Sequence, residues 1–397
     1  MLDTILLLML LLFIAALTRE EAVFTVFYLF ASAMMIGQWW GRRALKAVRF
    51  KRHFSRRAFL GDEVTLQLEL WNSGWLPVVW LRVQDNLPQE LVESTGFRWA
   101  VSLGPQARQQ FEYQLRARRR GYYRIGPLRL RSGDILGLLP NEQDLEGAPD
   151  HLTVYPKIVP LTRLALPSHS PLGTLRHTQP IFEDPSRVAG KRDYTFGDSL
   201  RRIDWKATAA AGRLQVKQFE PSIALETAIC LNLNAAEYSF RTRIDATELA
   251  IVIAASLANW IAGQRQSVGL ITNGVDPLSA EGQAQVLPPR KGRAHLIHIL
   301  EVLARIGMGE TYPLVERLQK ESVHLAWGVT LIVITGQVDE ALLTALVQAR
   351  RAGLKAIIVL AGRESAMEAA SYTRRAQHLG FPVHHIHTER DLDVWRQ

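Results

Sequence analysis

The sequence predicts a chain of several domains. They are an N-terminal transmembrane α-helical hairpin, a small all-β sandwich of immunoglobulin-like type, and an α/β domain with a doubly wound sheet. Three observations lead to this fold class: two apolar runs at the N-terminus, alternating apolar and polar residues after Gly61, and short apolar runs separated by helical stretches after Pro221. With 397 residues, 48% hydrophobic and 21% charged, the chain has the size and composition of a folded multidomain protein.

The N-terminal apolar runs predict a transmembrane hairpin within residues 1–40. The run from Ala22 to Trp40 has no charged residue and is long enough to cross a bilayer, and it ends in Trp39 and Trp40, where interfacial aromatic residues are common. The run from Ile5 to Leu17 is shorter. A signal peptide is the alternative for it, although the basic segment that precedes such peptides is missing.

Residues 41–57 are strongly basic and are predicted to form a juxtamembrane linker. By the positive-inside rule this side of the bilayer is cytoplasmic, so we expect a multi-pass protein of the cell membrane with cytoplasmic soluble domains. Much of the net charge of +9 is thereby assigned to lipid headgroups, and nucleic acid is not expected as a partner. The residues expected at the membrane surface are Arg42, Arg43, Lys46, Arg49, Lys51, Arg52, Arg56 and Arg57.

Period-two alternation predicts the β-sandwich over residues 58–140. Val64, Leu66, Leu68 and Leu70 alternate with polar residues, which is typical of a half-buried strand. Short strands separated by Gly and Pro continue from there, and residues 141–150 are predicted to be an exposed linker.

Residues 226–397 predict a parallel sheet with helices on both faces, because short β-branched runs alternate with helical stretches. In such a sheet, ligands bind at the carboxyl ends of the strands. These ends are residues 232–237, 272–274, 335–340 and 361–365. The chain contains no glycine-rich phosphate loop, so neither a nucleotide nor another cofactor is expected. The apolar stretch 249–258 predicts a buried helix rather than a third span.

The segment KRDYTFGDSLRRIDWKATAAAGRLQVKQFE, residues 191–220, resembles the signature of the domain-of-unknown-function-58 (DUF58) family. It lies in the stretch 151–225 that links the sandwich to the α/β core, and the order of the other parts also resembles the family over nearly the whole chain. The matching positions are Arg192, Tyr194, Gly197, Asp198, Arg202, Ile203, Asp204, Trp205, Leu214 and Val216.

The resemblance implies a von Willebrand factor A-like C-terminal half and a MoxR-type AAA+ ATPase as partner, with a role in the assembly or maturation of other proteins. It implies no enzymatic reaction. Domains of this type often bind a divalent cation through Asp-x-Ser-x-Ser and a further Asp. The corresponding positions here are Asn232, Asn234, Ala236 and Gly336. The resemblance therefore implies a degenerate site that holds no metal, since anionic oxygens are missing.

The signature supports two hypotheses about residues 192–205. In the first, Arg192, Asp198, Arg202 and Asp204 form a charged network, anchored by Tyr194 and Trp205 with a turn at Gly197, that clamps the domains together. In the second, the segment is a docking surface for a partner. Catalysis by the two carboxylates is disfavoured because adjacent Arg side chains would lower their pKa values.

We therefore expect a membrane-anchored scaffold or adaptor that binds a protein partner and membrane lipid, and not an enzyme. No catalytic residue is assigned. The alternative is a metal-assisted hydrolytic enzyme of unknown substrate, which would need convergent acids at the strand ends. A nucleic-acid-binding protein is the less favoured alternative.

Overall fold

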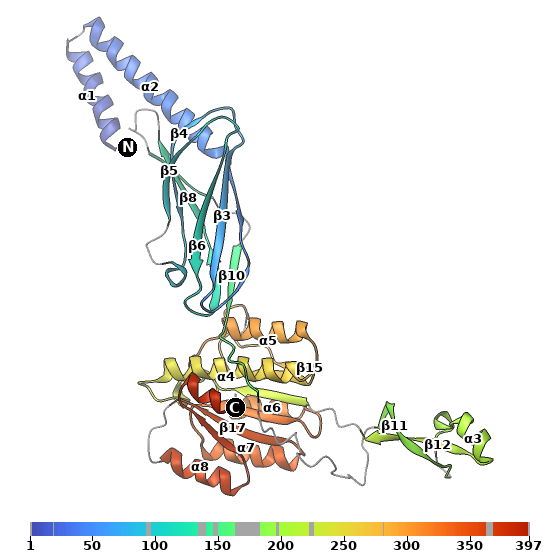
Figure 1. Cartoon of the computed structure of the whole chain (residues 1–397). Coiled ribbons are helices and arrows are strands. Elements are labelled where there is room, and N and C mark those ends of the chain that lie inside the picture. Colours follow the sequence, from blue (N-terminus) through green and yellow to red (C-terminus); the bar gives the residue numbers. More distant parts are fainter. Residues whose placement is uncertain are drawn as a thin grey trace. The chain divides into compact units, whose positions relative to one another are not determined.

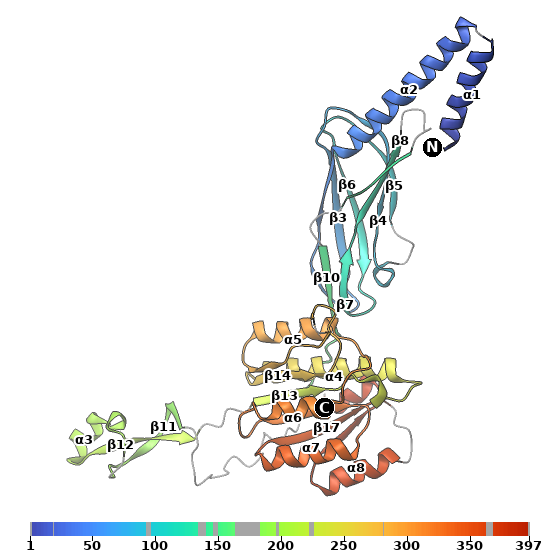
Figure 2. The ribbon, with the colours of Figure 1, turned by 180° about the vertical axis from the view of Figure 1, so that it is seen from behind.

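The computed structural model describes residues 2–18, 20–92, 97–133, 140–145, 150–162, 183–195, 198–221, 226–280, 282–362 and 368–395. The chain divides into two compact units. One is Met1–Lys157 with Leu300–Ile306, and the other is Ile158–Ile299 with Gly307–Gln397. Figures 1 and 2 show the elements of each unit from opposite sides.

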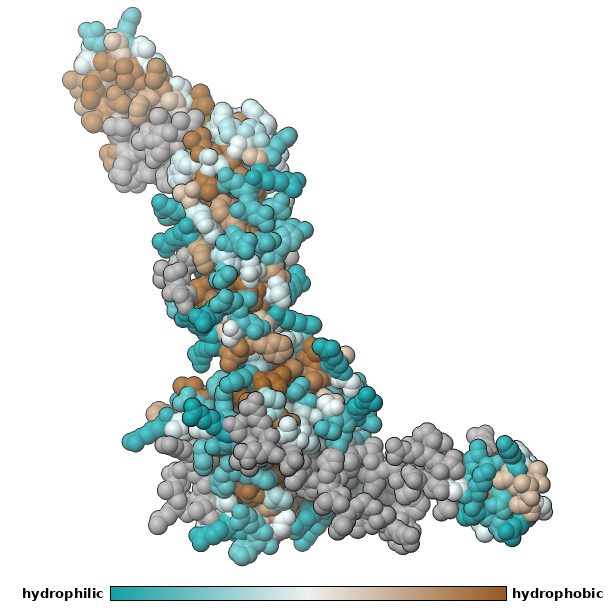
Figure 3. Space-filling view, in the orientation of Figure 1, coloured by the Kyte–Doolittle hydropathy of each residue, from teal (hydrophilic) through white to brown (hydrophobic). Residues whose placement is uncertain are grey.

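The first unit begins with two antiparallel apolar helices, α1 (Leu2–Thr18) and α2 (Glu21–Lys46), which pack against each other (Figure 1). By length and composition α2 could cross a membrane, whereas α1 is shorter than that test requires. The apolar surface of this pair is visible in Figure 3. The two apolar helices therefore suggest that the chain associates with membranes.

The basic segment 41–57 is not a linker, which corrects the prediction. Helix α2 continues to Lys46, and β1 (Val48–His53) and β2 (Arg57–Phe59) follow almost at once. Ala44, Leu45 and Val48 are buried in the core of the β-rich domain. These apolar residues alternate with the basic ones, so the segment has one buried face and one exposed face.

The β-rich domain contains three sheets around one core. The strand order in the sheets is β1–β3–β6, β5–β4–β8–β9 and β2–β10–β7. The remaining strands are β3 (Glu63–Asn72), β4 (Val78–Asp85), β5 (Arg98–Leu103), β6 (Arg108–Arg116), β7 (Gly121–Ile125), β8 (Leu128–Gly133), β9 (Pro140–Leu145) and β10 (Asp150–Tyr155). The predicted alternation is confirmed, because Val64, Leu66, Leu68 and Leu70 of β3 are all buried. Strands β9 and β10 lie where a linker is predicted, so the domain boundary moves from 140 to 157.

The α/β domain is built on a six-stranded sheet in the order β15–β14–β13–β16–β17–β18. The predicted strands pair in parallel, and they are β13 (Glu226–Leu231), β14 (Ser267–Thr272), β16 (Thr330–Thr335), β17 (Lys355–Ala361) and β18 (Val383–Ile386). The edge strand β15 (Leu287–Arg290) is antiparallel, so the sheet is mixed rather than parallel. Its two prolines hide it from a strand pattern, since Pro is confined to sheet edges.

The helices of this domain are α4 (Arg243–Gly263), α5 (Arg293–Arg305), α6 (Leu314–Ser322), α7 (Glu340–Arg351) and α8 (Glu368–His378). Helices α4 and α7 lie on opposite faces of the sheet in both ribbon views. Most of α4 is buried, which confirms that the apolar stretch 249–258 belongs to a sheet-covering helix. The sequence analysis does not predict α6.

The signature lies in a small substructure that we call the arm, residues 183–195 and 198–221. Strands β11 (Glu183–Asp193) and β12 (Gln215–Pro221) form an antiparallel pair, and η2 (Leu200–Arg202) and the short helix α3 (Trp205–Ala211) lie in the connection between them. The backbone N–H of Tyr194 donates to the carbonyl of Leu214, and Ile203 forms a bridge with Val216, so η2 and α3 are tied to the strands.

Candidate functional site

Polar side chains from three strand ends meet at the carboxyl edge of the sheet. Asn232 follows β13, Asn273 follows β14 and Thr335 ends β16, and all three are buried. The side-chain amide of Asn232 donates to Thr335 Oγ1 at 2.9 Å, and that of Asn273 donates to Asn232 Oδ1 at 3.0 Å. The predicted convergence of strand ends therefore holds for residues 232–237, 272–274 and 335–340.

The carboxylate of Glu237, rather than a cation, completes this cluster. Asn232 Nδ2 donates to Glu237 Oε2 at 2.6 Å, and Asn234 Nδ2 donates to Oε1 at 3.1 Å. Asn232 Oδ1 accepts from the Asn234 backbone N–H and from Asn273, so both of its lone pairs are used. A cation needs oxygen lone pairs, whereas the amide groups here present N–H donors to a carboxylate.

The position that resembles the further metal-binding acid is closed by its neighbours. A Cβ atom on Gly336 would lie 2.4 Å from Tyr238 Cδ1 and 2.7 Å from the carbonyl oxygen of Glu237. Tyr238 is fixed there because its hydroxyl donates to the carbonyl of Asn232 at 2.7 Å. Ala236 contributes only its backbone N–H, which donates to Asn234 Oδ1. These residues do not fit a divalent cation.

Among the side chains that the structure describes, no group of three or more His, Cys, Asp or Glu could hold a metal ion. The positions singled out from the sequence are Asn232, Asn234, Ala236 and Gly336. The cluster also contains Glu237, Asn273, Thr335 and Tyr238, which are not singled out from the sequence. All four lie in or next to the strand ends expected to bind ligands. Which of these side chains hydrogen-bond to one another depends on the direction in which each points, and a local sequence pattern does not reveal that direction.

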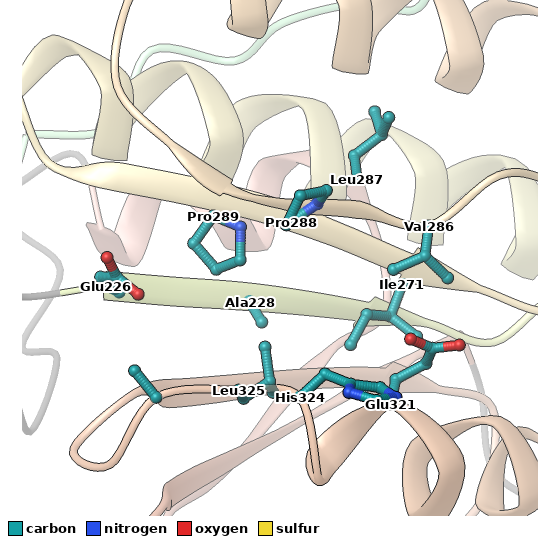
Figure 4. A pocket seen from close by; sticks show the side chains of 11 residues that line it. Glu226, Ala228, Ile271, Val286, Leu287, Pro288, Pro289, Glu321, His324 and Leu325 are labelled. Atoms are coloured by element: carbon teal, nitrogen blue, oxygen red, sulfur yellow. The ribbon is translucent and has the colours of Figure 1, made fainter.

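A separate pocket of about 210 Å³ lies beside the start of β13, at the opposite end of that strand from the cluster (Figure 4). Its lining includes Glu226, Pro288, Pro289, Glu321 and His324. None of the residues predicted to form a site contributes to it.

The arm contains the ion pair that the signature predicts. The guanidinium of Arg192 donates to both carboxylate oxygens of Asp198, at 2.7 Å each. The backbone N–H and the hydroxyl of Thr195 donate to the same carboxylate at 2.9 Å. The bidentate geometry fixes the chain between β11 and η2. Gly197, the predicted turn residue, lies outside the described residues.

Two further acids fasten α3 to the strands. Asp204 caps α3 by accepting from the Ala207 N–H at 3.1 Å, and it also pairs with Lys191 at 2.9 Å. Asp193 accepts a hydrogen bond from the side chain of Gln215 and pairs with Arg213 at 3.1 Å. Both predicted acids are thus in ion pairs, Asp198 with Arg192 and Asp204 with Lys191.

The aromatic anchor differs from the prediction. Trp205 is 69% exposed, and Leu200 of η2 is 68% exposed. Helix α3 has no buried residue, so it offers the indole no apolar surface to pack against. Tyr194 is partly buried, and Arg202 is exposed in η2. The ion pairs, together with the buried side chains of Ile203 and Val216, hold the arm in shape.

The Arg192–Asp198 pair predicts resistance of the arm to acid. Because the Arg192 guanidinium and the Thr195 N–H bond the carboxylate, the pKa of Asp198 is held well below its usual range. This stabilisation is complete above the usual carboxyl pKa and is lost only as the pH falls through the lower folded-state value. Carboxyl ¹³C NMR titration should show the low midpoint, and Arg192→Gln should return it toward the ordinary value. An unchanged midpoint in that variant would contradict the assignment.

The basic residues near the membrane helix divide into two kinds. Those exposed as predicted are Arg42, Arg43, Lys46, Arg49, Lys51, Arg56 and Arg57. Arg52 is the exception and corrects the prediction, because only 2% of its side chain is exposed. Its guanidinium pairs with Asp85 at 2.7 Å and with Asp150 at 3.3 Å inside the β-rich domain, so it cannot contact lipid headgroups.

Comparison with known proteins supports the resemblance. Residues 190–370 match the family model described as protein of unknown function DUF58. The uncharacterized protein YeaD of Bacillus subtilis (strain 168) is 27% identical over 293 residues, which cover 72% of this chain and 68% of YeaD.

Two solved structures have low similarity. An aerotolerance-related membrane protein from Bacteroides fragilis is 12% identical, with a TM-score of 0.32, and the match covers 43% of this chain and 95% of that one. The CARDB domain of the PF1109 protein from Pyrococcus furiosus is 16% identical, with a TM-score of 0.20, covering 27% of this chain and 86% of that one. The family-model match spans most of the arm and much of the α/β domain, and it supports the resemblance of residues 190–370 to the DUF58 family.

Proposed function

We propose that this chain is a membrane-anchored adaptor that binds a protein partner through the arm. The observation that carries the proposal is the exposure of Trp205 and Leu200 on a frame fixed by ion pairs. Trp is the residue most enriched among binding hot spots, and a rigid frame reduces the conformational entropy lost on binding. Exposed Lys206 follows Trp205 in α3, and exposed Lys217 lies in β12 of the same arm, so the expected partner offers an apolar pocket with an acidic rim.

The membrane part of the proposal rests on the two N-terminal helices. We place both α1 and α2 across the cell membrane, with the exposed basic residues after α2 on the cytoplasmic side. The β-rich domain, the arm and the α/β domain are then cytoplasmic. The family resemblance makes a MoxR-type AAA+ ATPase the first candidate partner, with assembly or maturation of other proteins as the shared task.

Binding rather than catalysis is favoured by the cluster at the sheet edge. Glu237 is held by the amides of Asn232 and Asn234 at 2.6 and 3.1 Å, and this assigns its carboxylate a structural role in the cluster. The arm carries the exposed apolar side chains of Leu200 and Trp205. The proposal therefore assigns recognition to the arm and a structural role to the strand-end cluster.

Site-specific photocrosslinking in native membranes tests this proposal. A photoreactive amino acid at position 205 or 200 should give one discrete crosslinked product, which mass spectrometry identifies, whereas the same amino acid at exposed Phe240 should not. Trp205→Ala should weaken the binding of the identified partner about 30-fold or more, as expected for loss of about 2 kcal/mol at a hot spot. Equal crosslinking at positions 205 and 240, or unchanged binding by the folded variant, would refute the docking role.

A further inference from the structure

The β-rich domain exposes apolar side chains beside the C-terminal end of α2. Trp75 is 68% exposed in the loop between β3 and β4, which we call the 73–77 loop. Trp39 of α2 and Val79 at the start of β4 are exposed as well, and Arg43 lies over the Trp39 ring at 6.0 Å. An indole has an apolar body and a polar N–H, so an exposed one beside other exposed apolar side chains marks a candidate interaction surface.

The 73–77 loop is fastened to α2 rather than free. The indole N–H of Trp40 donates to the carbonyl of Pro77 at 3.1 Å. Ser73 donates to the carbonyl of Ala47 through its backbone N–H at 2.9 Å and through its hydroxyl at 2.7 Å. A Cβ atom on Gly74 would approach the Ala47 Cβ to 2.8 Å, so the loop backbone packs directly against the end of the helix segment.

The loop is also rigid within itself. Asn72 is buried, its amide donates to the carbonyl of Leu76 at 2.8 Å, and its Oδ1 accepts from the Gly74 N–H at 2.9 Å. Leu76 and Val78 are buried in the core of the domain. Trp75 is thus held outward by a turn whose neighbours point inward.

The depth of the loop follows from its partners on the helix. The uncharged run of α2 ends at Trp40, and a run of this length spans the hydrocarbon core. The loop bonds to Trp40 and to Ala47, so it lies at the level where the span leaves the bilayer. Exposed basic side chains stand at the same level, namely those of Arg42, Arg43, Lys46 and Arg49. Indoles and cations together match the interfacial region of a bilayer with anionic lipids.

We propose that the 73–77 loop enters the lipid headgroup region and that Trp75 is an interfacial anchor of the β-rich domain. The fixed loop then joins α2 and the domain into one body at the membrane surface, without a flexible linker between them. This inference rests on the proposed membrane span of α2. The proposed binding partner of the loop is a lipid surface. The loop then gives the β-rich domain a membrane contact in addition to the transmembrane span of α2.

Depth-dependent fluorescence quenching on the full-length chain tests the inference. Cys230, the only native cysteine, is buried, and burial raises the pKa of its thiol to about 12, so it should not compete for a thiol-reactive dye. The variants Trp75→Cys, Val26→Cys and Phe59→Cys are labelled with an environment-sensitive dye and reconstituted in vesicles of zwitterionic and anionic lipids. Val26 and Phe59 are both exposed, the first within the span and the second in β2 of the same domain.

We expect a nitroxide near the headgroup to quench most of the fluorescence at position 75, and a nitroxide deep in the acyl chains to quench position 26. Position 59 should be quenched by neither. If position 75 behaves as position 59 while position 26 is quenched, the lipid contact of the loop is refuted and the span stands. If position 26 is not quenched, the span fails and the inference fails with it. Shielding of position 75 from aqueous iodide without quenching by either lipid would also refute it, because a protein would then cover the loop.

Discussion

Replacing Asp85 with alanine is expected to destabilise the β-rich domain by about 3–5 kcal/mol, because the change leaves Arg52 buried without its main counter-ion. Asp85 is fully buried in β4 and accepts from Arg52 at 2.7 and 3.1 Å in a bidentate pair. The hydroxyl of Tyr113 also donates to it. Asp150, at 3.3 Å from the other side of the guanidinium, cannot supply the bonds that are lost.

Hydrogen exchange of the full-length chain in detergent measures this effect by domain, since the peptides of β3 and β4 report the opening of their own core. The matched control is Asp144→Ala in the same domain. Asp144 pairs with Arg129 at 3.0 Å, but both side chains are about half exposed, so this change should cost 1 kcal/mol or less. Asp85→Asn keeps the side-chain volume and is the second variant to measure if the alanine variant does not fold. Equal exchange in the Asp85 and Asp144 variants would contradict the assigned role of the network.

Arg52 also shows why part of the structure could not be read from the sequence. It stands in a dense basic run after an apolar span, which is the pattern of a membrane-surface segment. Its acidic partners lie 33 and 98 residues further along the chain, so no local pattern reveals its burial. The exposure of Trp205 could not be read from the sequence either, because it depends on the shortness of α3 and not on the hydrophobicity of the indole.

Periodic elements could be predicted, because burial imposes a repeat on each of them. The parallel strands of the α/β domain and the alternation in β3 follow from apolar spacing alone. The location of the strand-end cluster could be predicted, since parallel strands end at one edge of the sheet. The hydrogen bonds within the cluster could not be predicted. The sequence shows Asn232 and Asn234 where the resemblance implies Asp and Ser. Only the structure shows that their amides bind Glu237.

Gly336→Asp is expected to destabilise the α/β domain by about 3 kcal/mol or more. The added Cβ would lie 2.4 Å from the Tyr238 ring, and overpacking of this kind costs about 1–3 kcal/mol. The new carboxylate would also lie near the carbonyl of Glu237, which adds electrostatic repulsion beside the buried Tyr238 ring. Hydrogen exchange of β13 and β16 peptides in the full-length chain, with and without Mg²⁺, measures the loss and any recovery.

Gly307→Asp is the matched control, because a Cβ at Gly307 meets no atom within 4 Å and the same charge is added to the same domain. It should change exchange little. Mg²⁺ should not restore protection in Gly336→Asp, since the amides of Asn232 and Asn234 already bind the carboxylate of Glu237 and Asn232 Oδ1 already accepts two hydrogen bonds. Recovery with Mg²⁺ would mean that Tyr238 and Glu237 can move aside to form a metal site. The sheet edge would then be a candidate ligand site, and the structural role assigned to the hydrogen-bonded cluster would be refuted.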